Sequence, residues 1–562
     1  MPSDGVITEI DVAMPMRDGM VLRSDLMRPD GPGPFPALLN RTPYKKSVDD
    51  LEAFARAGYA VLSQDLRGRY ASDGEFVVFS EECTLDAEDG YDSVEWIARQ
   101  PWCTGRVGTF GASYNAWAQY QLARLQPPHL VAMSAASIPT ELTDVDWPGA
   151  FKPARRLKWW FTNMAPDLRR RAGLPPPHTK EEAVAEWEAK IGEDFIHRLP
   201  YVELCDLLPP PLRTQARKWM ENPGIRPWRL EDAHRKITVP NLDFTGWFDH
   251  CCSIGNFLGL RENAATEIAR NQTRMVIGPW NHGGFGRRVL GDFDFGSEAA
   301  VDVQQIQIRW FDYWLKREAN RLQEEPAVRY FVMGSGRWRS ATTWPPPESR
   351  LRTLFLDSLE MAPGPGTSGR LSEDGPDTES CVTFTSDPNA PVPTLWDSSW
   401  FSRVADRREL NHRTDILRFR SEPLNCELEI AGNPGATILL SSDAPDTDLF
   451  ARLADEYPDG TAMEICYGMV RARHRDGTDK EALLKTGERV GITIPMGITA
   501  CRFAVGHRIR LEITSSDFPN HDRNHQTGRN DLFDPELRVA RNTVWQSVNC
   551  PSRLELPVMT GD

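Results

Sequence analysis

Three residues that could together turn a hydroxyl group into a nucleophile stand in separate segments of this sequence. Ser113 lies where the apolar strand predicted over Val107–Phe110 meets a sharp Gly-Ala-Ser turn and then a helix. Such a turn lifts the serine clear of the sheet, and the backbone N–H groups at the start of the helix can hold an oxyanion. The alternative is an ordinary strand–turn–helix. A serine hydroxyl is a poor nucleophile alone, so a base and an acid are needed.

Two further apolar runs end in residues that could supply the acid and the base. The run 239–249 ends in Asp249, and the run 274–282 ends in His282. In α/β-hydrolases the chain order is serine, acid, histidine, and the active site lies at the carboxyl ends of parallel strands. We therefore predict that His282 takes the serine proton and that Asp249 orients His282. His250 is the competing base, and it ranks lower because it adjoins the acid in the chain.

An early strand and turn could complete an oxyanion hole. The run Ala37–Tyr44 predicts a strand followed by an Asn-Arg-Thr-Pro-Tyr turn. In this fold one donor is the N–H of the residue after the serine, here Tyr114, and the second comes from an early strand loop. Tyr44 could supply that second donor through its phenolic hydroxyl. The alternative for Tyr44 is an aromatic side chain packed on the surface.

The elements that must position these residues fall into three regions. Residues 1–140 and 237–350 alternate short apolar strands with helices, which predicts a mostly parallel sheet. Residues 141–236 are rich in Trp, Arg, Glu and Pro at helical spacing and predict a helical cap. Residues 351–562 alternate apolar and polar residues, which predicts a β jelly roll. The expected fold class is α/β: an α/β-hydrolase domain with an inserted helical cap, followed by a C-terminal jelly-roll domain.

Short motifs along nearly the whole chain, in order, resemble the cocaine esterase and X-Pro dipeptidyl peptidase family. In the first half the matching runs are Arg41-Thr-Pro-Tyr44, Gln64-Asp-Leu-Arg-Gly68, Ala71-Ser-Asp-Gly-Glu-Phe76, Gly111-Ala-Ser-Tyr114, Gly246-Trp-Phe-Asp249 and Gly278-Pro-Trp-Asn-His282. In the second half they are Asp446-Thr-Asp-Leu-Phe-Ala-Arg-Leu453, Tyr457-Pro-Asp-Gly460, Ser516-Asp-Phe-Pro-Asn520 and Asp522-Arg-Asn524. The resemblance is closest to the cocaine-esterase-like branch, and it implies a galactose-binding-like C-terminal domain.

The resemblance implies a role for each candidate residue. Ser113 is the nucleophile, His282 the base and Asp249 the acid, while the Tyr44 hydroxyl and the Tyr114 N–H form the oxyanion hole. The implied reaction is hydrolysis of a carboxylic ester through an acyl-enzyme. No metal and no organic cofactor is expected.

Three regions are expected to contribute to the substrate pocket. The cap contributes Trp147 and Trp160, the segment after the acid contributes Cys251, and the C-terminal domain contributes Trp400 and Phe401. In the family, cap tryptophans line the acyl or aryl pocket, and aromatic side chains suit an apolar ring in a substrate. The alternative for the tryptophans is packing within the cap. The sequence departs from the family pattern at Cys251, where an aromatic residue is usual, and at Ala116, where the family usually has glycine.

Amide chemistry remains an alternative to ester hydrolysis. β-Lactam acylases, α-amino-acid ester hydrolases and X-Pro dipeptidyl peptidases share the same elbow, and the last two must recognise a charged amine with carboxylates. The amino-acid ester hydrolases carry acids just after the triad acid, whereas His250–Ser253 has none. Glu141, Asp144 and Asp146 in the early cap could still provide acids. Acyl transfer to an acceptor other than water, and an inactive hydrolase domain beside a binding module, also remain open.

The composition of the chain argues against several classes of binding partner. The 562-residue chain has a net charge of −15, which argues against binding of nucleic acid or an anionic membrane. It has no apolar run of about 18 residues and no signal-peptide pattern at its start, so a cytoplasmic location is expected. The ten cysteines lack paired metal-ligand spacing and predict free thiols. The expected partner is a small-molecule ester with an aromatic or apolar acyl group, and a homodimer through the C-terminal domain is compatible with the sequence.

The segment His521–His525 could be read as a metal site, but the sequence favours a polar loop packed on the hydrolase domain.

Overall fold

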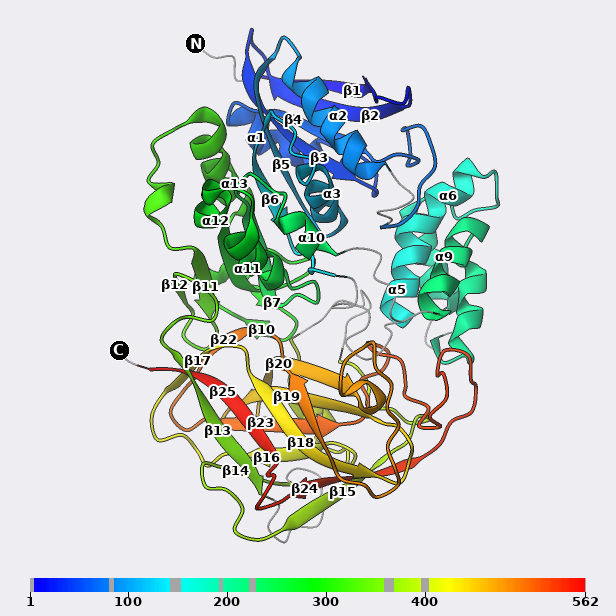
Figure 1. Ribbon diagram of the computed structural model, residues 1–562, viewed down its shortest axis with the longest axis vertical. Helices are drawn as coiled ribbons and strands as arrows, with labels where there is room; N and C mark the ends of the chain where they lie inside the picture. Colours follow the sequence, from blue (N-terminus) through cyan, green and yellow to red (C-terminus); the bar gives the residue numbers. More distant parts are fainter. Residues whose placement is uncertain are drawn as a thin grey trace.

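The computed structural model describes residues 5–79, 85–141, 153–191, 196–221, 229–357, 368–395 and 404–560. Figure 1 shows an α/β region at one end of the molecule, a group of helices beside it and a β-rich region at the other end. We call these the α/β region, the cap and the β region. Among the described residues, no helix is long and apolar enough to cross a membrane.

The sheet of the α/β region is mixed at one edge and parallel through its centre. Its first six strands lie in the order β1 (Val6–Pro15), β2 (Val21–Pro29), β4 (Ala60–Asp65), β3 (Phe35–Thr42), β5 (Cys103–Ala112) and β6 (Leu130–Ala136). The pairs β1–β2 and β2–β4 are antiparallel, whereas β4, β3, β5 and β6 run parallel. The carboxyl ends of β3, β5 and β6 therefore meet at one edge.

Four more strands continue this sheet beyond the cap. Their order is β7 (Leu242–Phe248), β8 (Arg274–Asn281), β11 (Val328–Val332) and β12 (Arg337–Ala341), with only the last pair antiparallel. A parallel bridge between Met133 and Asn241 places β7 beside β6. The Asn241 side chain reinforces the junction, because its amide bonds the N–H and the C=O of Ala135 at 2.8 and 3.0 Å. The ends of β7 and β8 thus share the edge formed by β3, β5 and β6.

Helices pack closely against this sheet. The main ones are α2 (Asp86–Ala98), α3 (Tyr114–Ala123), α11 (Ile254–Asn263), α12 (Glu267–Gln272) and α13 (Val303–Phe311). A Cβ atom on Gly90 in α2 would lie 2.5 Å from the Cβ of Leu122 in α3, so only glycine allows these two helices to approach so closely. Helix α13 ends at Phe311 and continues directly into a π-helical segment, Asp312–Lys316.

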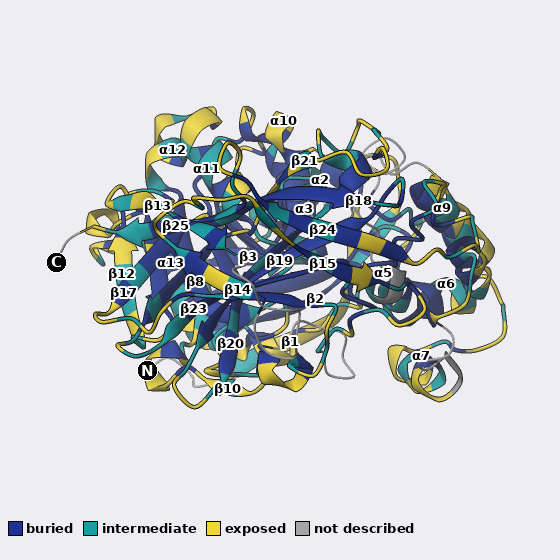
Figure 2. Cartoon of the chain, turned by 90° about the horizontal axis from the view of Figure 1, so that it is seen from below, coloured by how far each residue is buried: buried dark blue, intermediate teal, exposed yellow. Residues whose placement is uncertain are grey.

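In the described part of the chain between β6 and β7, the elements of the cap are helical. They include α5 (Pro153–Trp159), a π-helical turn η2 (Trp160–Met164), α6 (Ala165–Arg171), α7 (Lys180–Glu186), a 3₁₀ segment η4 (Tyr201–Leu207), α9 (Pro210–Glu221) and α10 (Leu230–His234). Figure 2 shows that α7 and α9 expose an outer face while the strands of the two sheets are mostly buried. The inner face of the cap packs into the same apolar core as α3.

The β region is a network of thirteen described strands from β13 (Ser349–Asp357) to β25 (Arg553–Met559). Four of its strands in which apolar and polar residues alternate are β18 (Gly435–Ser442), β20 (Ala462–Arg471), β21 (Val490–Pro495) and β23 (Arg508–Thr514). Its alternating apolar residues form a core that continues into the end of β7. There the indole N–H of Trp247 donates to the carbonyl of Phe331 at 2.8 Å, and its ring lies 5.5 Å from that of Trp344.

Candidate active site

Ser113 occupies a sharp turn between β5 and α3, as the sequence predicts. Its backbone has φ 60° and ψ −125°, a conformation that costs energy in a non-glycine residue and that nucleophile elbows share. Gly111, with φ 133°, makes the turn possible, because a Cβ atom there would lie 2.7 Å from the Cβ of Asn115. The Ser113 N–H donates to the carbonyl of Ala136 at 3.0 Å, which ties the turn to the end of β6. Ala116 is buried in the core below the turn.

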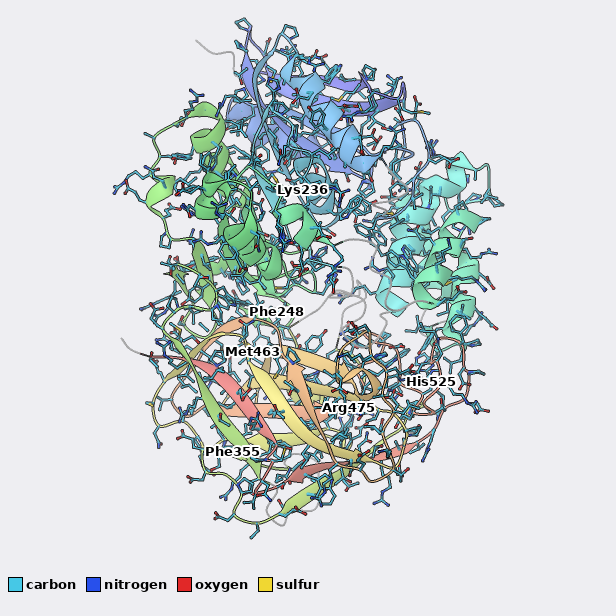
Figure 3. All side chains as sticks on the ribbon, viewed as in Figure 1. Lys236, Phe248, Phe355, Met463, Arg475 and His525 are labelled. Carbon is cyan, nitrogen blue, oxygen red and sulfur yellow. The ribbon has the colours of Figure 1, made fainter. Side chains whose placement is uncertain are left out.

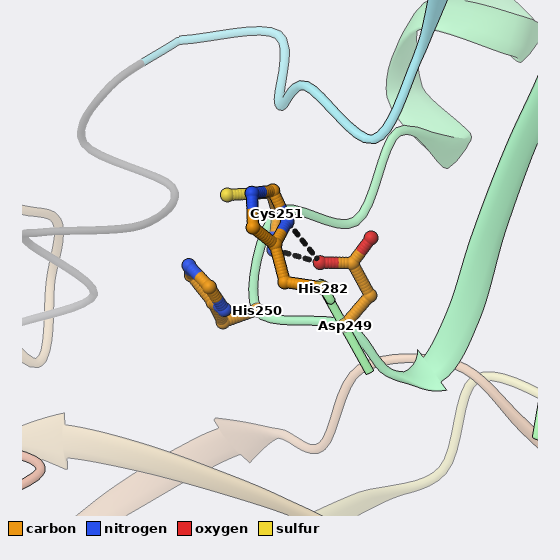
Figure 4. A group of neighbouring side chains, drawn as sticks. All are labelled: Asp249, His250, Cys251 and His282. Atoms are coloured by element: carbon orange, nitrogen blue, oxygen red, sulfur yellow. Dashed lines mark hydrogen bonds and ion pairs between the residues drawn. The ribbon is translucent and has the colours of Figure 1, made fainter. Parts of the chain in front are cut away.

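Asp249 and His282 meet at the same edge of the sheet. Each is the first residue after its strand, and the parallel register of β7 and β8 pairs Phe248 with Asn281, directly before them. His282 Nδ1 lies 3.0 Å from Asp249 Oδ1, and a dashed line marks this contact in Figure 4. This is the contact by which an acid orients a catalytic histidine and selects its tautomer.

Two further groups hold the Asp249 carboxylate. The backbone N–H of Cys251 donates to Oδ1 at 2.9 Å, and the hydroxyl of Ser137 donates to Oδ2. The same hydroxyl lies 2.9 Å from His282 Nδ1. Ser137 is not among the residues predicted from the sequence. Its signal is its position directly after β6, because polar residues at the ends of parallel strands lie at the edge where the site forms.

The charged forms of Asp249 and His282 stabilise each other. Burial by itself would raise the pKa of Asp249, but His282, Ser137 and the Cys251 N–H outweigh it and lower that pKa below its ordinary value. Burial likewise would lower the pKa of His282, but Cys251 and Asp249 raise it to about 10. The site therefore favours a carboxylate beside an imidazolium, which is the state that forms when the base accepts the proton of the serine.

Tyr44 follows β3 and hydrogen-bonds Ser113. Burial raises its pKa to about 12, although hydrogen bonds with Trp159 and Ser113 oppose this rise, so the phenol stays protonated and can donate. Trp159 at the end of α5 donates its indole N–H to the Tyr44 hydroxyl at 3.3 Å. Trp159 is not among the tryptophans predicted from the sequence, which are Trp147 and Trp160. The structure thus brings the Tyr44 hydroxyl to Ser113, as an oxyanion donor requires.

Tyr114 begins α3, the helix whose N-terminal N–H groups face the elbow. The role predicted for Tyr114 in the oxyanion hole uses its backbone N–H, and its side chain makes other contacts. The phenol accepts a hydrogen bond from the Phe79 N–H at 3.0 Å, and the two rings stack at 4.1 Å. The Tyr44 ring meets the Tyr114 ring edge-on at 6.5 Å. This packing fixes the position of the first helical turn, and with it the N–H proposed for the oxyanion hole.

The residues predicted for the substrate pocket have different surroundings. Trp160 is fully buried and packs on Trp219 at 5.2 Å, which favours the alternative of packing within the cap. Cys251 is buried and hydrogen-bonds His282. Trp147, Trp400 and Phe401 lie outside the described residues.

A cavity of about 500 Å³ lies between the end of β7 and the β region, beside the acid. On the side of the α/β region it is lined by Phe248, Asp249, His250 and Cys252, and on the other side by residues that include Met469, Arg475, Met496 and His521. Figure 3 shows Phe248 at the boundary of the two regions, near the strands of the β region that carry Met463.

The segment His521–His525 contacts the cap, whereas the sequence predicted packing on the hydrolase domain. Arg523 donates from Nε to the Tyr201 hydroxyl at 2.9 Å and from Nη2 to the His197 carbonyl at 3.0 Å. Guanidinium groups often hold such junctions because their donors are fixed in one plane.

Comparison with known proteins shows which families the chain matches. Residues 18–284 match the family described as X-Pro dipeptidyl-peptidase (S15 family), and residues 320–555 match the X-Pro dipeptidyl-peptidase C-terminal non-catalytic domain. Cocaine esterase from Rhodococcus sp. (strain MB1 Bresler) is 33% identical, over 98% of each chain.

Solved structures also resemble the chain over nearly its whole length. An aminopeptidase from a marine sediment Thaumarchaeota archaeon has a TM-score of 0.80 at 24% identity, over 100% of this chain and 98% of its own. An α-amino acid ester hydrolase has a TM-score of 0.78 at 22% identity, over 99% and 97%. These likenesses confirm an α/β-hydrolase fold with a C-terminal domain made largely of β-sheet.

Proposed function

The chain belongs to the cocaine esterase and X-Pro dipeptidyl-peptidase (S15) family of hydrolases, as its motifs predicted, and we propose that it is a serine esterase whose triad is Ser113, His282 and Asp249. The observation that carries the assignment is the 3.0 Å contact between His282 and Asp249 at the ends of β8 and β7. It lies at the sheet edge that also holds the elbow of Ser113.

The proposed mechanism is acyl transfer in two steps. Ser113 Oγ attacks the ester carbonyl while His282 accepts the hydroxyl proton, and the Tyr44 hydroxyl and the Tyr114 N–H stabilise the oxyanion. The C–O bond to the alcohol then breaks, and His282 protonates the departing oxygen. Water enters, gives its proton to His282 and adds to the acyl-enzyme. Collapse returns that proton to Ser113 and releases the acid.

We propose that the acyl group is aromatic or apolar. Four aromatic rings gather beside the elbow, because Phe79 stacks on Tyr114 at 4.1 Å and on Trp159 at 5.9 Å, while Tyr44 meets Trp159 edge-on at 6.4 Å. Such rings favour apolar and aromatic ligands through burial and ring contacts. The curated relative is named for action on cocaine, so a small-molecule ester substrate is the class that both lines of argument support.

Cleavage of substrates that carry an amine is the second candidate. It is favoured by the likeness to an aminopeptidase and an α-amino acid ester hydrolase. Recognition of an ammonium group needs carboxylates in the pocket. The chain has none in the segment 250–253 that follows the acid. Of the early cap acids, Glu141 lies opposite Arg229 in an isolated antiparallel β-bridge between their backbones, and Asp144 and Asp146 lie outside the described residues.

A panel of substrates separates the two candidates. We expect cleavage of p-nitrophenyl esters with benzoate preferred over acetate, and little cleavage of a phenylglycine methyl ester or an Ala-Pro anilide. The measurement is kcat/KM for each substrate. A deaminated analogue of the phenylglycine ester serves as the matched control for the amine. Cleavage confined to the substrates that carry an amine would reject the esterase proposal in favour of the peptidase or amino-ester reading.

Replacing Tyr44 by phenylalanine tests the oxyanion hole. The variant keeps the ring and its packing but loses the neutral donor, so we expect kcat to fall by about 10²–10³-fold with a small change in KM. Steady-state kinetics measures both constants. Tyr91→Phe in α2, where the ring lies under Arg17, is the control and should keep the original rate. A Tyr44→Phe enzyme with unchanged kcat would remove Tyr44 from the mechanism.

We also propose a cytoplasmic location and, for the assembly, a homodimer through the β region. The nine described cysteines are all free, which is typical of a reducing compartment. Sedimentation of the purified chain would test the dimer.

A further inference from the structure

Four side chains that could bind a metal ion gather at the candidate triad. Asp249, His250 and Cys251 are consecutive after β7, and His282 follows β8. Each of the four residues offers one ligand atom, and these atoms all lie within 4.8 Å of one another. Figure 4 shows the four side chains gathered in one place. The set combines two imidazoles, one thiol and one carboxylate. The catalytic proposal uses only two of the four.

The composition of this cluster suits Zn²⁺. Zn²⁺ binds imidazole nitrogen, thiolate sulfur and carboxylate oxygen in tetrahedral sites. Ligand atoms at about 2.0–2.3 Å from one Zn²⁺ lie roughly 3.3–3.8 Å apart, so an approach of about 1 Å would close the cluster around the ion. Mg²⁺ and Ca²⁺ instead prefer sites made of oxygen ligands. The thiol and the two imidazoles therefore favour Zn²⁺ over these more abundant ions.

The surroundings already hold most of the cluster in place. The Asp249 carboxylate is bonded by the Cys251 N–H at 2.9 Å and by His282 at 3.0 Å. The rings of His250 and His282 lie 4.6 Å apart between centroids, and Cys251 hydrogen-bonds His282. A carboxylate that orients a metal-binding histidine is the usual support of zinc sites. The site needs little rearrangement to accept an ion.

An ion could reach the cluster from solvent. His250 and His282 are partly exposed, whereas Asp249 and Cys251 are buried beneath them. Asp249 and His250 also line the cavity of about 500 Å³ between the α/β and β regions.

We propose that Zn²⁺ binds to His250, Cys251 and His282, with Asp249 as the fourth ligand or as the partner that orients His282, and that this binding reversibly inhibits the enzyme. The Cys251 thiol gives up its proton to solvent as the Zn–S bond forms. The ring of His282 is then engaged by the ion and does not accept the proton of Ser113. The ion acts here as an inhibitor, and hydrolysis itself proceeds without it.

Metal binding can be tested without any catalytic turnover. Chain carrying Ser113→Ala is stripped with a chelator and dialysed against Zn²⁺, and the bound metal is counted. We expect one Zn²⁺ per chain. Adding His250→Ala or Cys251→Ala to this background should weaken binding at least about a hundredfold. Cys252→Ala, the next thiol in the chain but outside the cluster, is the matched control and should bind as before.

A spectroscopic measurement separates loss of a metal ligand from poor folding of a variant. Cys251→Ser keeps nearly the same volume but replaces the thiolate ligand. Co²⁺ bound in place of Zn²⁺ should show a thiolate charge-transfer band, and this band should be absent in Cys251→Ser. No bound Zn²⁺, or Zn²⁺ bound equally well after the His250 and Cys251 substitutions, would overturn the site.

Inhibition is measured separately, since it rests on the proposed role of His282 whereas metal binding does not. Ester hydrolysis by the unmodified chain should fall at least tenfold at saturating Zn²⁺ and recover with chelator. For each variant, the rate with Zn²⁺ is compared with its own rate without metal, and the inhibitory concentration should rise in His250→Ala. Zn²⁺ that binds at the cluster and leaves the rate unchanged would overturn the inhibitory role.

Discussion

Replacing Ser113 by alanine is expected to lower kcat for ester hydrolysis by about 10⁴–10⁶-fold without unfolding the chain. The substitution removes only the hydroxyl oxygen, so the backbone of the elbow, with φ 60°, keeps the same Cβ atom and the same strain. The hydrogen bond from the residue 113 N–H to Ala136 also remains. The loss therefore reports on chemistry and not on the fold. Steady-state kinetics and circular dichroism together check the prediction.

Covalent labelling gives an independent measure of the same residue. A fluorophosphonate should label the unmodified chain at Ser113 and should leave Ser113→Ala unlabelled. Ser349→Ala at the start of β13, far from the elbow, is the control and should keep both activity and labelling. If Ser113→Ala retained most of the activity, the triad would be wrong. If the unmodified chain resisted the reagent, an inactive hydrolase domain beside a binding module would be favoured.

Replacing Asp249 by asparagine is expected to lower kcat by about 10⁴-fold, because the amide can hold His282 in the wrong tautomer. The carboxylate accepts from Ser137 and from the Cys251 N–H and contacts His282 at 3.0 Å, so its position is well defined. The asparagine side chain has the same shape. The measured fall in kcat should therefore come from the lost negative charge and the added N–H donors at residue 249, and not from a change in side-chain shape.

The same variant should change the pH profile in a defined direction. His282 must be neutral to accept a proton, so activity is lost as the pH falls below its pKa. Asp249 contributes to raising that pKa to about 10, together with Cys251 and against the effect of burial. Removing the negative charge should lower the pKa and move the acid limb of kcat/KM to lower pH. Asp294→Asn, in a surface ion pair with Arg288, is the control. An Asp249→Asn enzyme with unchanged kcat and acid limb would contradict its role.

Much of the candidate site could be predicted from the sequence because its signals are local. The strand, turn and helix around Ser113 follow from an apolar run, two glycines and helical spacing within about a dozen residues. Asp249 and His282 each end an apolar strand, and parallel strands bring such ends to one edge of the sheet. The order of motifs along the chain then indicated the family, which the comparisons confirm. None of these inferences needed a contact between distant segments.

Contacts between distant segments were decided only by the tertiary structure. Ser137 reaches Asp249 and His282 because β6 adjoins β7, and Trp159 reaches Tyr44 because the cap packs over the elbow. The cluster of His250 and Cys251 around His282 depends on the register of β7 with β8. Register and packing depend on the summed burial of many side chains over the whole fold, and no short segment encodes that sum. The sequence by itself therefore determined which residues carry the proposed chemistry, and the tertiary structure decided which neighbours hold them in place.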